Sequence, residues 1–154
     1  MPAFNAATTP KLGYEAVFTV YDYHDCPRGG VANFHGVTHF YECVFDEKRD
    51  DYSDRYLLIP IKQEAFRAAI ENWEIFLRWR KAFDLGEVSR ETHPALPRDK
   101  SRYEETKWIL DQAVLSGRHK AIRARGEFDV LGEPTLPRDV ITPWQVRWSE
   151  LQGS

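Results

Sequence analysis

The segment DYHDCPRGGVANFHG, residues 22–36, concentrates side chains that could do chemistry. Four polar residues in or near this segment could line a small pocket: Asp22, His24, Arg28 and Glu42. Two nearby carboxylates raise each other's proton affinity, so either one could serve as a general base. A histidine titrates near neutrality and could act as an acid or a ligand, and an arginine could clamp an anion. These residue types predict a site for small-ligand binding or a hydrolase-like reaction.

The same residues also suit a structural role. Arg28 could pair with Asp22 or Glu42 and so tie the 24–29 loop to the sheet. We favour this structural interpretation, because the chain has no Gly-x-Ser-x-Gly, P-loop or Gly-x-Gly-x-x-Gly pattern and matches no catalytic motif. Whether the protein is an enzyme stays open at this level.

The histidines and cysteines have poor spacing for a metal site. His35 and His39 are four residues apart in a segment of strand composition, where that spacing is about 13 Å, too long for one ion to bridge. Cys26 and Cys43 are too few for a disulfide framework. We therefore predict no metal ion and no cofactor.

Hydrophobic periodicity predicts the elements that position these residues. Strands are expected at 14–23, 55–60, 120–130 and 144–148, a hairpin at 29–46 with its turn at His35-Gly36, and helices at 63–86 and 101–115. This order predicts an α+β fold, in which an antiparallel, barrel-like sheet of about six strands has two helices inserted between strands 4 and 5. The chain 1–154 is expected to form a single domain, with a flexible 1–13 segment and a 150–154 tail.

The predicted sheet register is what gathers the four polar residues. A turn at His35-Gly36 aligns 31–34 with 37–40. Symmetric closure of the 24–29 loop would then set Asp22 opposite Val31, and Tyr23 opposite Gly30. One face would carry Val20 with both carboxylates. The other face would carry Tyr21, Tyr23, Phe34, His39, Tyr41, Cys43 and Phe45.

Both predicted helices have a second apolar ridge. Ile75 and Trp79 lie off the main apolar arc of the first helix, and Trp108 and Leu115 lie off that of the second. These ridges could contact the sheet and the neighbouring helix. They could also form a subunit or partner interface, where aromatic residues are enriched. The four residues are therefore the interface candidates.

Composition and charge limit the function classes. The chain has 154 residues, of which 42% are hydrophobic and 14% aromatic, as suits a folded domain with an aromatic-rich core. A net charge of −3 disfavours nucleic-acid binding, for which the basic 118–125 segment is the remaining candidate. Neither a membrane-spanning run nor a signal-peptide pattern is visible, so we expect a cytoplasmic protein.

The leading functional hypothesis is a non-catalytic protein-interaction or regulatory module that self-associates, as a homodimer, or binds another protein. It depends on the surplus tryptophan ridges and on the missing catalytic motifs. The alternative is a small-ligand-binding protein or hydrolase-like enzyme with a polar pocket around the 22–30 loop.

Overall fold

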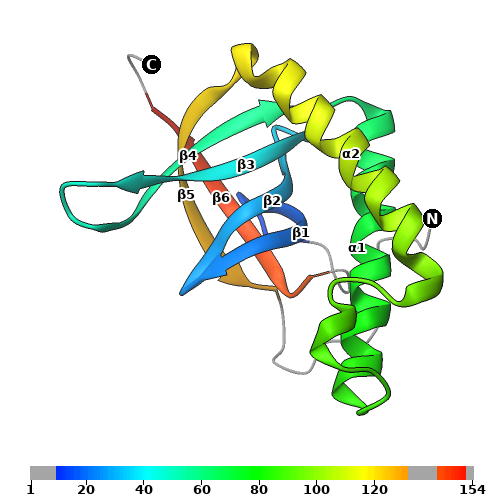
Figure 1. Ribbon diagram of the computed structural model, residues 1–154. Helices are drawn as coiled ribbons and strands as arrows, with labels where there is room; N and C mark the ends of the chain where they lie inside the picture. Colours follow the sequence, from blue (N-terminus) through cyan, green and yellow to red (C-terminus); the bar gives the residue numbers. More distant parts are fainter. Residues whose placement is uncertain (1–9, 132–141, 152–154) are drawn as a thin grey trace. The chain divides into compact units, whose positions relative to one another are not determined.

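The computed structural model describes residues 10–131 and 142–151, and its chain divides into two compact units (Figure 1). The first unit combines Met1–Ile61 with Gly117–Ser154, and the second is Lys62–Ser116. The single-domain organisation stays a prediction. Most of the 1–13 segment and most of the 150–154 tail lie outside the described residues.

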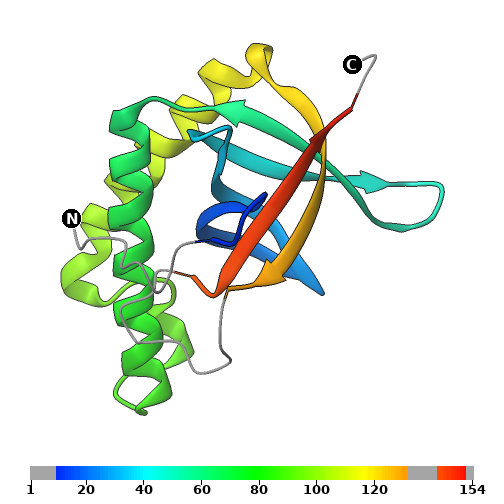
Figure 2. The same cartoon turned by 180° about the vertical axis from the view of Figure 1, so that it is seen from behind.

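The first unit is a closed antiparallel barrel whose six strands follow the chain order (Figures 1 and 2). The strands are β1 (Glu15–His24), β2 (Cys26–Phe34), β3 (Val37–Asp46), β4 (Asp51–Pro60), β5 (Ile122–Val130) and β6 (Trp144–Glu150). β6 pairs with both β5 and β1, which closes the barrel. The α+β fold class is confirmed, with both helices inserted between β4 and β5.

The β2–β3 turn explains why the predicted register holds in this hairpin. His35 and Gly36 both have positive φ angles, 52° and 75°, as the two central residues of a type I′ turn require. The Glu15 carboxylate accepts hydrogen bonds from both of their backbone N–H groups, at 2.9 and 2.8 Å. The predicted alignment of 31–34 with 37–40 is confirmed.

The β1–β2 turn is tighter than predicted. The chain reverses at Asp25, whose φ is 64°, instead of in a symmetric 24–29 loop. Asp22 therefore pairs with Gly29 and not with Val31, and Tyr23 also pairs nearer the turn than predicted. Three register shifts along β1 accompany this pairing, as β-bulges do.

These shifts change which β1 side chains face the barrel core. Val20, predicted to share a face with the carboxylates, instead packs against the core cluster that includes Tyr41. Tyr21 and Tyr23, predicted to share a face with Tyr41, are exposed. The predicted face was therefore wrong for Val20, because one extra residue in a strand reverses the alternation that follows it.

Large rings fill the barrel core. Tyr41, Tyr56, Phe128 and Trp148 contact one another, with centroid distances of 5.4 Å for Tyr41–Phe128 and for Tyr56–Trp148. Gly126 permits this packing, because a Cβ there would lie 2.6 Å from the Trp148 ring. The core of this unit is therefore filled by side chains.

The second unit contains two helices joined by a folded connection. They are α1 (Gln63–Asp84) and α2 (Lys100–Gly117), and the connection includes the 3₁₀ turns η2 (Arg90–Thr92) and η3 (Pro97–Asp99); a further turn, η4 (Arg118–Lys120), follows α2 in the first unit. The buried Asn72 amide joins α1 to α2, because it donates to the Tyr103 carbonyl and to the Thr106 hydroxyl, both at 3.1 Å. No helix in the described part of the chain is long and apolar enough to cross a membrane.

Candidate functional site

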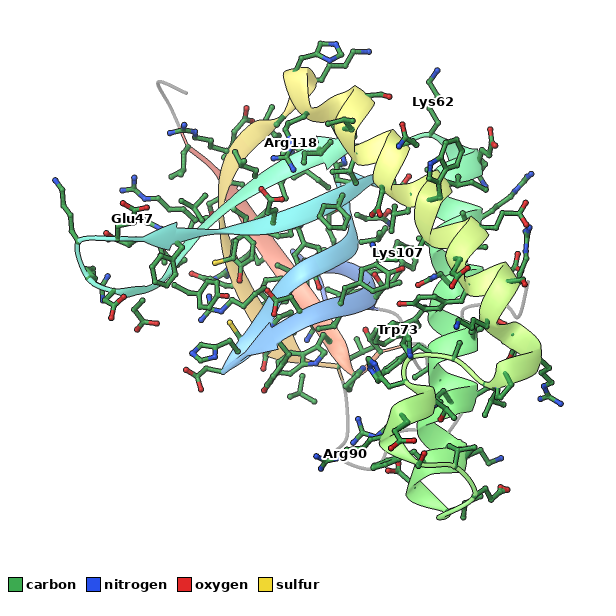
Figure 3. The ribbon with its side chains drawn as sticks, viewed as in Figure 1. Glu47, Lys62, Trp73, Arg90, Lys107 and Arg118 are labelled. Atoms are coloured by element: carbon green, nitrogen blue, oxygen red, sulfur yellow. The ribbon has the colours of Figure 1, made fainter. Side chains whose placement is uncertain are left out.

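The two predicted carboxylates lie on one face of the barrel sheet. Asp22 on β1 and Glu42 on β3 are both aligned with Gly29 on β2, so the three residues form one row across the sheet. The Glu42 carboxylate accepts two hydrogen bonds from the Arg118 guanidinium, at 3.0 and 3.1 Å. This surface pair, with Arg118 labelled in Figure 3, replaces the predicted pairing of Glu42 with Arg28.

Arg28 binds backbone carbonyls and a sulfur. Its Nε donates to the His24 carbonyl at 2.9 Å, and its Nη1 donates to the Ser53 carbonyl at 3.0 Å and to Cys43 Sγ at 3.5 Å. The guanidinium also lies 5.0 Å from the centroid of the Tyr52 ring. Arg28 thus ties β2 to the ends of β1 and β4, which is the structural role that we favoured, with different partners.

The four predicted pocket residues lie on two faces of the sheet. Glu42 and Cys43 are adjacent in β3 and face opposite ways, and Arg28 binds on the Cys43 side. The His24 ring is exposed and lies 5.2 Å from the Tyr52 ring. The structure therefore places Asp22 and Glu42 on one face with β2 between them, and brings only Arg28 into contact with the backbone of His24. A ligand-binding role for these residues stays a prediction.

The two thiols surround a buried phenol. Cys26 Sγ lies 3.9 Å from the Tyr56 hydroxyl, which donates to the Pro27 carbonyl at 2.7 Å. Burial raises the pKa of the Cys43 thiol, and the hydrogen bond from Arg28 offsets only part of this effect. Both cysteines are free thiols, and within 10–131 and 142–151 no cluster of three His, Cys, Asp or Glu side chains could hold a metal ion. The raised pKa disfavours a thiolate nucleophile at Cys43.

The basic 118–125 segment has its charges partly neutralised. Arg118 pairs with Glu42, and Arg125 pairs with Asp54 at 2.8 Å. A hollow of about 700 Å³ beside the β3–β4 hairpin includes Arg125, and Asp54 also lines it. These acidic neighbours reduce the positive charge of the segment and so disfavour phosphate binding there.

The four interface candidates divide into two pairs. Ile75 and Trp79 on α1 are buried, 1% and 5% exposed, whereas Trp108 and Leu115 on α2 are 63% and 68% exposed. Trp79 stacks on Phe83 at 5.0 Å, and its indole N–H donates to the Thr92 hydroxyl at 2.8 Å. Only the α2 pair is therefore available at the surface.

The exposed pair forms a ridge, which we call the α2 ridge. Trp108 and Leu115 are seven residues apart, two turns of helix, and so lie on the same face of α2. The buried residues of α2, Thr106 and Leu110, lie on the opposite face. Beside the ridge, Lys107 (labelled in Figure 3) pairs with Asp111 at 2.8 Å. The ridge is thus apolar with charged flanks.

Sequence reasoning missed a hollow at the end of α1, which we call the α1 hollow. Its volume is about 670 Å³. Its apolar lining is Ala82, Leu85, Val88, Leu96 and Pro97, and its charged lining is Arg78, Lys81, Glu87 and Arg98. Figure 1 shows the connection after α1 folding back beside the end of that helix. The signal in the sequence was Gly86, followed by apolar residues too few to form an element of their own.

Comparisons with known proteins give no relative for this chain. No protein-family model matches it, and no curated protein matches its sequence. No solved structure matches its fold.

Proposed function

We propose that this protein is a non-catalytic interaction module that self-associates through the α2 ridge. The observation that carries the proposal is the exposure of Trp108 and Leu115 on one helix face. An exposed indole and an exposed isobutyl group together would gain several kcal/mol, on the order of 3–5, from complete burial. A second copy of the chain that covers the ridge would supply this burial.

The chemistry of the barrel supports the non-catalytic part of the proposal. In the described residues, every buried polar side-chain atom has a hydrogen-bond partner. Arg28 is engaged by carbonyls, and the Cys43 thiol keeps its proton because burial raises its pKa. A catalytic site needs groups that are free to contact a substrate. Arg28 and Cys43 instead form contacts that hold the strands together.

Sedimentation velocity over a concentration series tests the proposal. We expect wild-type protein to change from monomer to a larger species as its concentration rises, and Trp108→Asp to remain monomeric. The matched control is Val37→Asp, which changes an exposed apolar residue of the barrel and should associate like wild type. Circular dichroism at a concentration where all three proteins are monomeric should show that all three are folded. A wild-type protein that is monomeric at every concentration would contradict the proposal.

A further inference from the structure

We infer that the α1 hollow is the docking site for the α2 ridge of a second copy of this chain. The inference rests on the proposed self-association and adds its geometry: the two contacting surfaces are different. Both surfaces belong to the Lys62–Ser116 unit. A ridge that fits a hollow elsewhere on the molecule produces head-to-tail association, which yields a ring or a growing chain.

Size and chemistry make the hollow suitable for an indole. The hollow has a volume of about 670 Å³ and is open to solvent, and five of its nine lining residues are apolar. A tryptophan inserted into such a pocket is the usual form of an interface hot spot. Trp108 supplies an indole that this chain leaves 63% exposed.

Charge complementarity favours the same arrangement. The charged lining of the hollow is three basic residues and one acid, Glu87, and the basic Lys81 and Arg98 belong to no ion pair in the described part of the chain. Glu104 lies one helical turn before Trp108 on the exposed face of α2, and it too has no ion pair among the described residues. When the indole enters the hollow, this carboxylate comes near the basic rim. Attraction between this carboxylate and the basic residues orients the two copies and speeds their association.

The hollow is held open by hydrogen bonds of its own unit. Beyond the end of α1, the N–H groups of Leu85 and Glu87 donate to the carbonyls of Lys81 and Ala82, at 3.1 and 2.9 Å. Gly86, with a φ of 75°, makes this reversal possible. On the other side, Arg78 binds Asp99 through two hydrogen bonds of 3.1 Å. A preformed site loses less conformational entropy on binding.

Symmetric packing of α2 against α2 is the competing arrangement, and it suits the ridge less well. Between Trp108 and Leu115, the same face carries Asp111 and Gln112. An antiparallel helix pair centred on this ridge would place these polar side chains in its seam. Desolvation of a carboxylate there is costly. The hollow instead receives one end of the ridge and leaves Asp111 with Lys107.

Mixing two variants tests the inference. Trp108→Asp removes the ridge and keeps the hollow, and Leu85→Asp fills the hollow with charge and keeps the ridge. Leu85 is 66% exposed, so this substitution should leave the fold intact, which circular dichroism would check. We expect each variant alone to be monomeric, with its dissociation constant raised at least about tenfold. An equimolar mixture should form a 1:1 dimer, because one intact ridge meets one intact hollow.

Three other outcomes would overturn the inference. If Leu85→Asp associates like wild type while Trp108→Asp does not, the ridge mediates self-association elsewhere, and only the proposed function survives. If both variants are monomeric and their mixture is too, ridge and hollow are not partners. If Trp108→Asp itself associates like wild type, both proposals are wrong.

A charge exchange gives a second test that leaves the apolar contacts unchanged. Glu104→Arg and Arg98→Glu should each weaken association about threefold or more, and the doubly substituted protein should recover most of the wild-type affinity. Both residues are exposed, so neither change should affect folding. Additive losses in the double variant would argue against contact between the two positions.

Discussion

In the barrel, Tyr41 and Tyr56 direct their hydroxyl groups to the carbonyls of Thr19 and Pro27, at 2.8 and 2.7 Å, and are almost fully buried. In the helical unit, Trp108 is also a large ring, yet 63% of it faces solvent. Residue type does not explain this difference in burial, because all three side chains are large rings with a polar group. Their surroundings do, because the barrel closes around its rings while α2 buries only Thr106 and Leu110.

Under the proposed function, the two units have different tasks. In the barrel, the core rings and Arg28 make internal contacts, although Tyr21, Tyr23 and Phe45 remain exposed. The helical unit keeps an apolar ridge and an apolar hollow at its surface. Substitutions in the barrel should therefore affect the free energy of unfolding, and substitutions at the ridge should affect association.

The largest expected effect comes from emptying the barrel core. Tyr41→Ala should lower the free energy of unfolding by about 3–5 kcal/mol, because it removes a fully buried ring and leaves a cavity. Trp108→Ala is its counterpart in the helical unit and should change stability by less than about 0.5 kcal/mol. Urea denaturation of both variants at a concentration where the protein is monomeric checks the difference. Equal losses of unfolding free energy in the two variants would contradict the contrast between the barrel and the helical unit.

A methyl group at Gly30 should cost about 3 kcal/mol. Its Cβ would lie 2.1 Å from the Thr19 carbonyl oxygen and 2.7 Å from the Tyr41 hydroxyl, so β1 and β2 would have to separate. Gly36→Ala is the matched control: its Cβ meets nothing within 4 Å, and only the positive φ of 75° is unfavourable, at about 1 kcal/mol. Thermal denaturation should rank the two variants in this order.

Arg28→Ala should lower the free energy of unfolding by about 2 kcal/mol, because two carbonyls and a thiol lose a charged donor. Arg80→Ala on α1 removes only an exposed pair with Asp84 and should cost less than about 0.5 kcal/mol. Denaturant titration compares the two. Unchanged stability in Arg28→Ala would instead revive the prediction of a ligand site there.

Alkaline pH should weaken the barrel through its buried phenols. Burial raises the pKa of Tyr41 and of Tyr56 in the folded protein, so both stay protonated when the unfolded chain already ionises, near pH 10. Their contribution is complete below that pH and declines above it, by up to about 1.4 kcal/mol per pH unit for each ring. Urea denaturation at several pH values measures the slope, and Tyr56→Phe should reduce it by one ring's share.

Sequence patterns predicted most of the architecture because they reflect interactions between residues that are close together in the chain. The amphipathic arc of 63–86 and the His35-Gly36 turn depend on neighbouring residues alone, and both appear as expected. The β1 register failed because Asp25 reverses the chain within one residue and the strand carries bulges. Bulges form where strands must bend to close the barrel, and local propensity does not encode this requirement.

The candidate site likewise has features that the sequence predicted and features that it did not. The residues with chemical potential were recognised from their types, but their partners were not: Glu42 binds Arg118, 76 residues away, and Arg28 binds Ser53. The four helix residues were selected by one periodicity rule, and only Trp108 and Leu115 proved exposed.

The sequence by itself determined the α+β class, the strand and helix order, and the abundance of rings, because periodicity and turn chemistry act over a few residues. Tertiary structure alone decided which rings are buried, where Arg28 finds its acceptors, and that a hollow forms where the chain reverses after α1. These features require residues far apart in the chain to meet, and the closing of a barrel and the folding back of a connection bring them together.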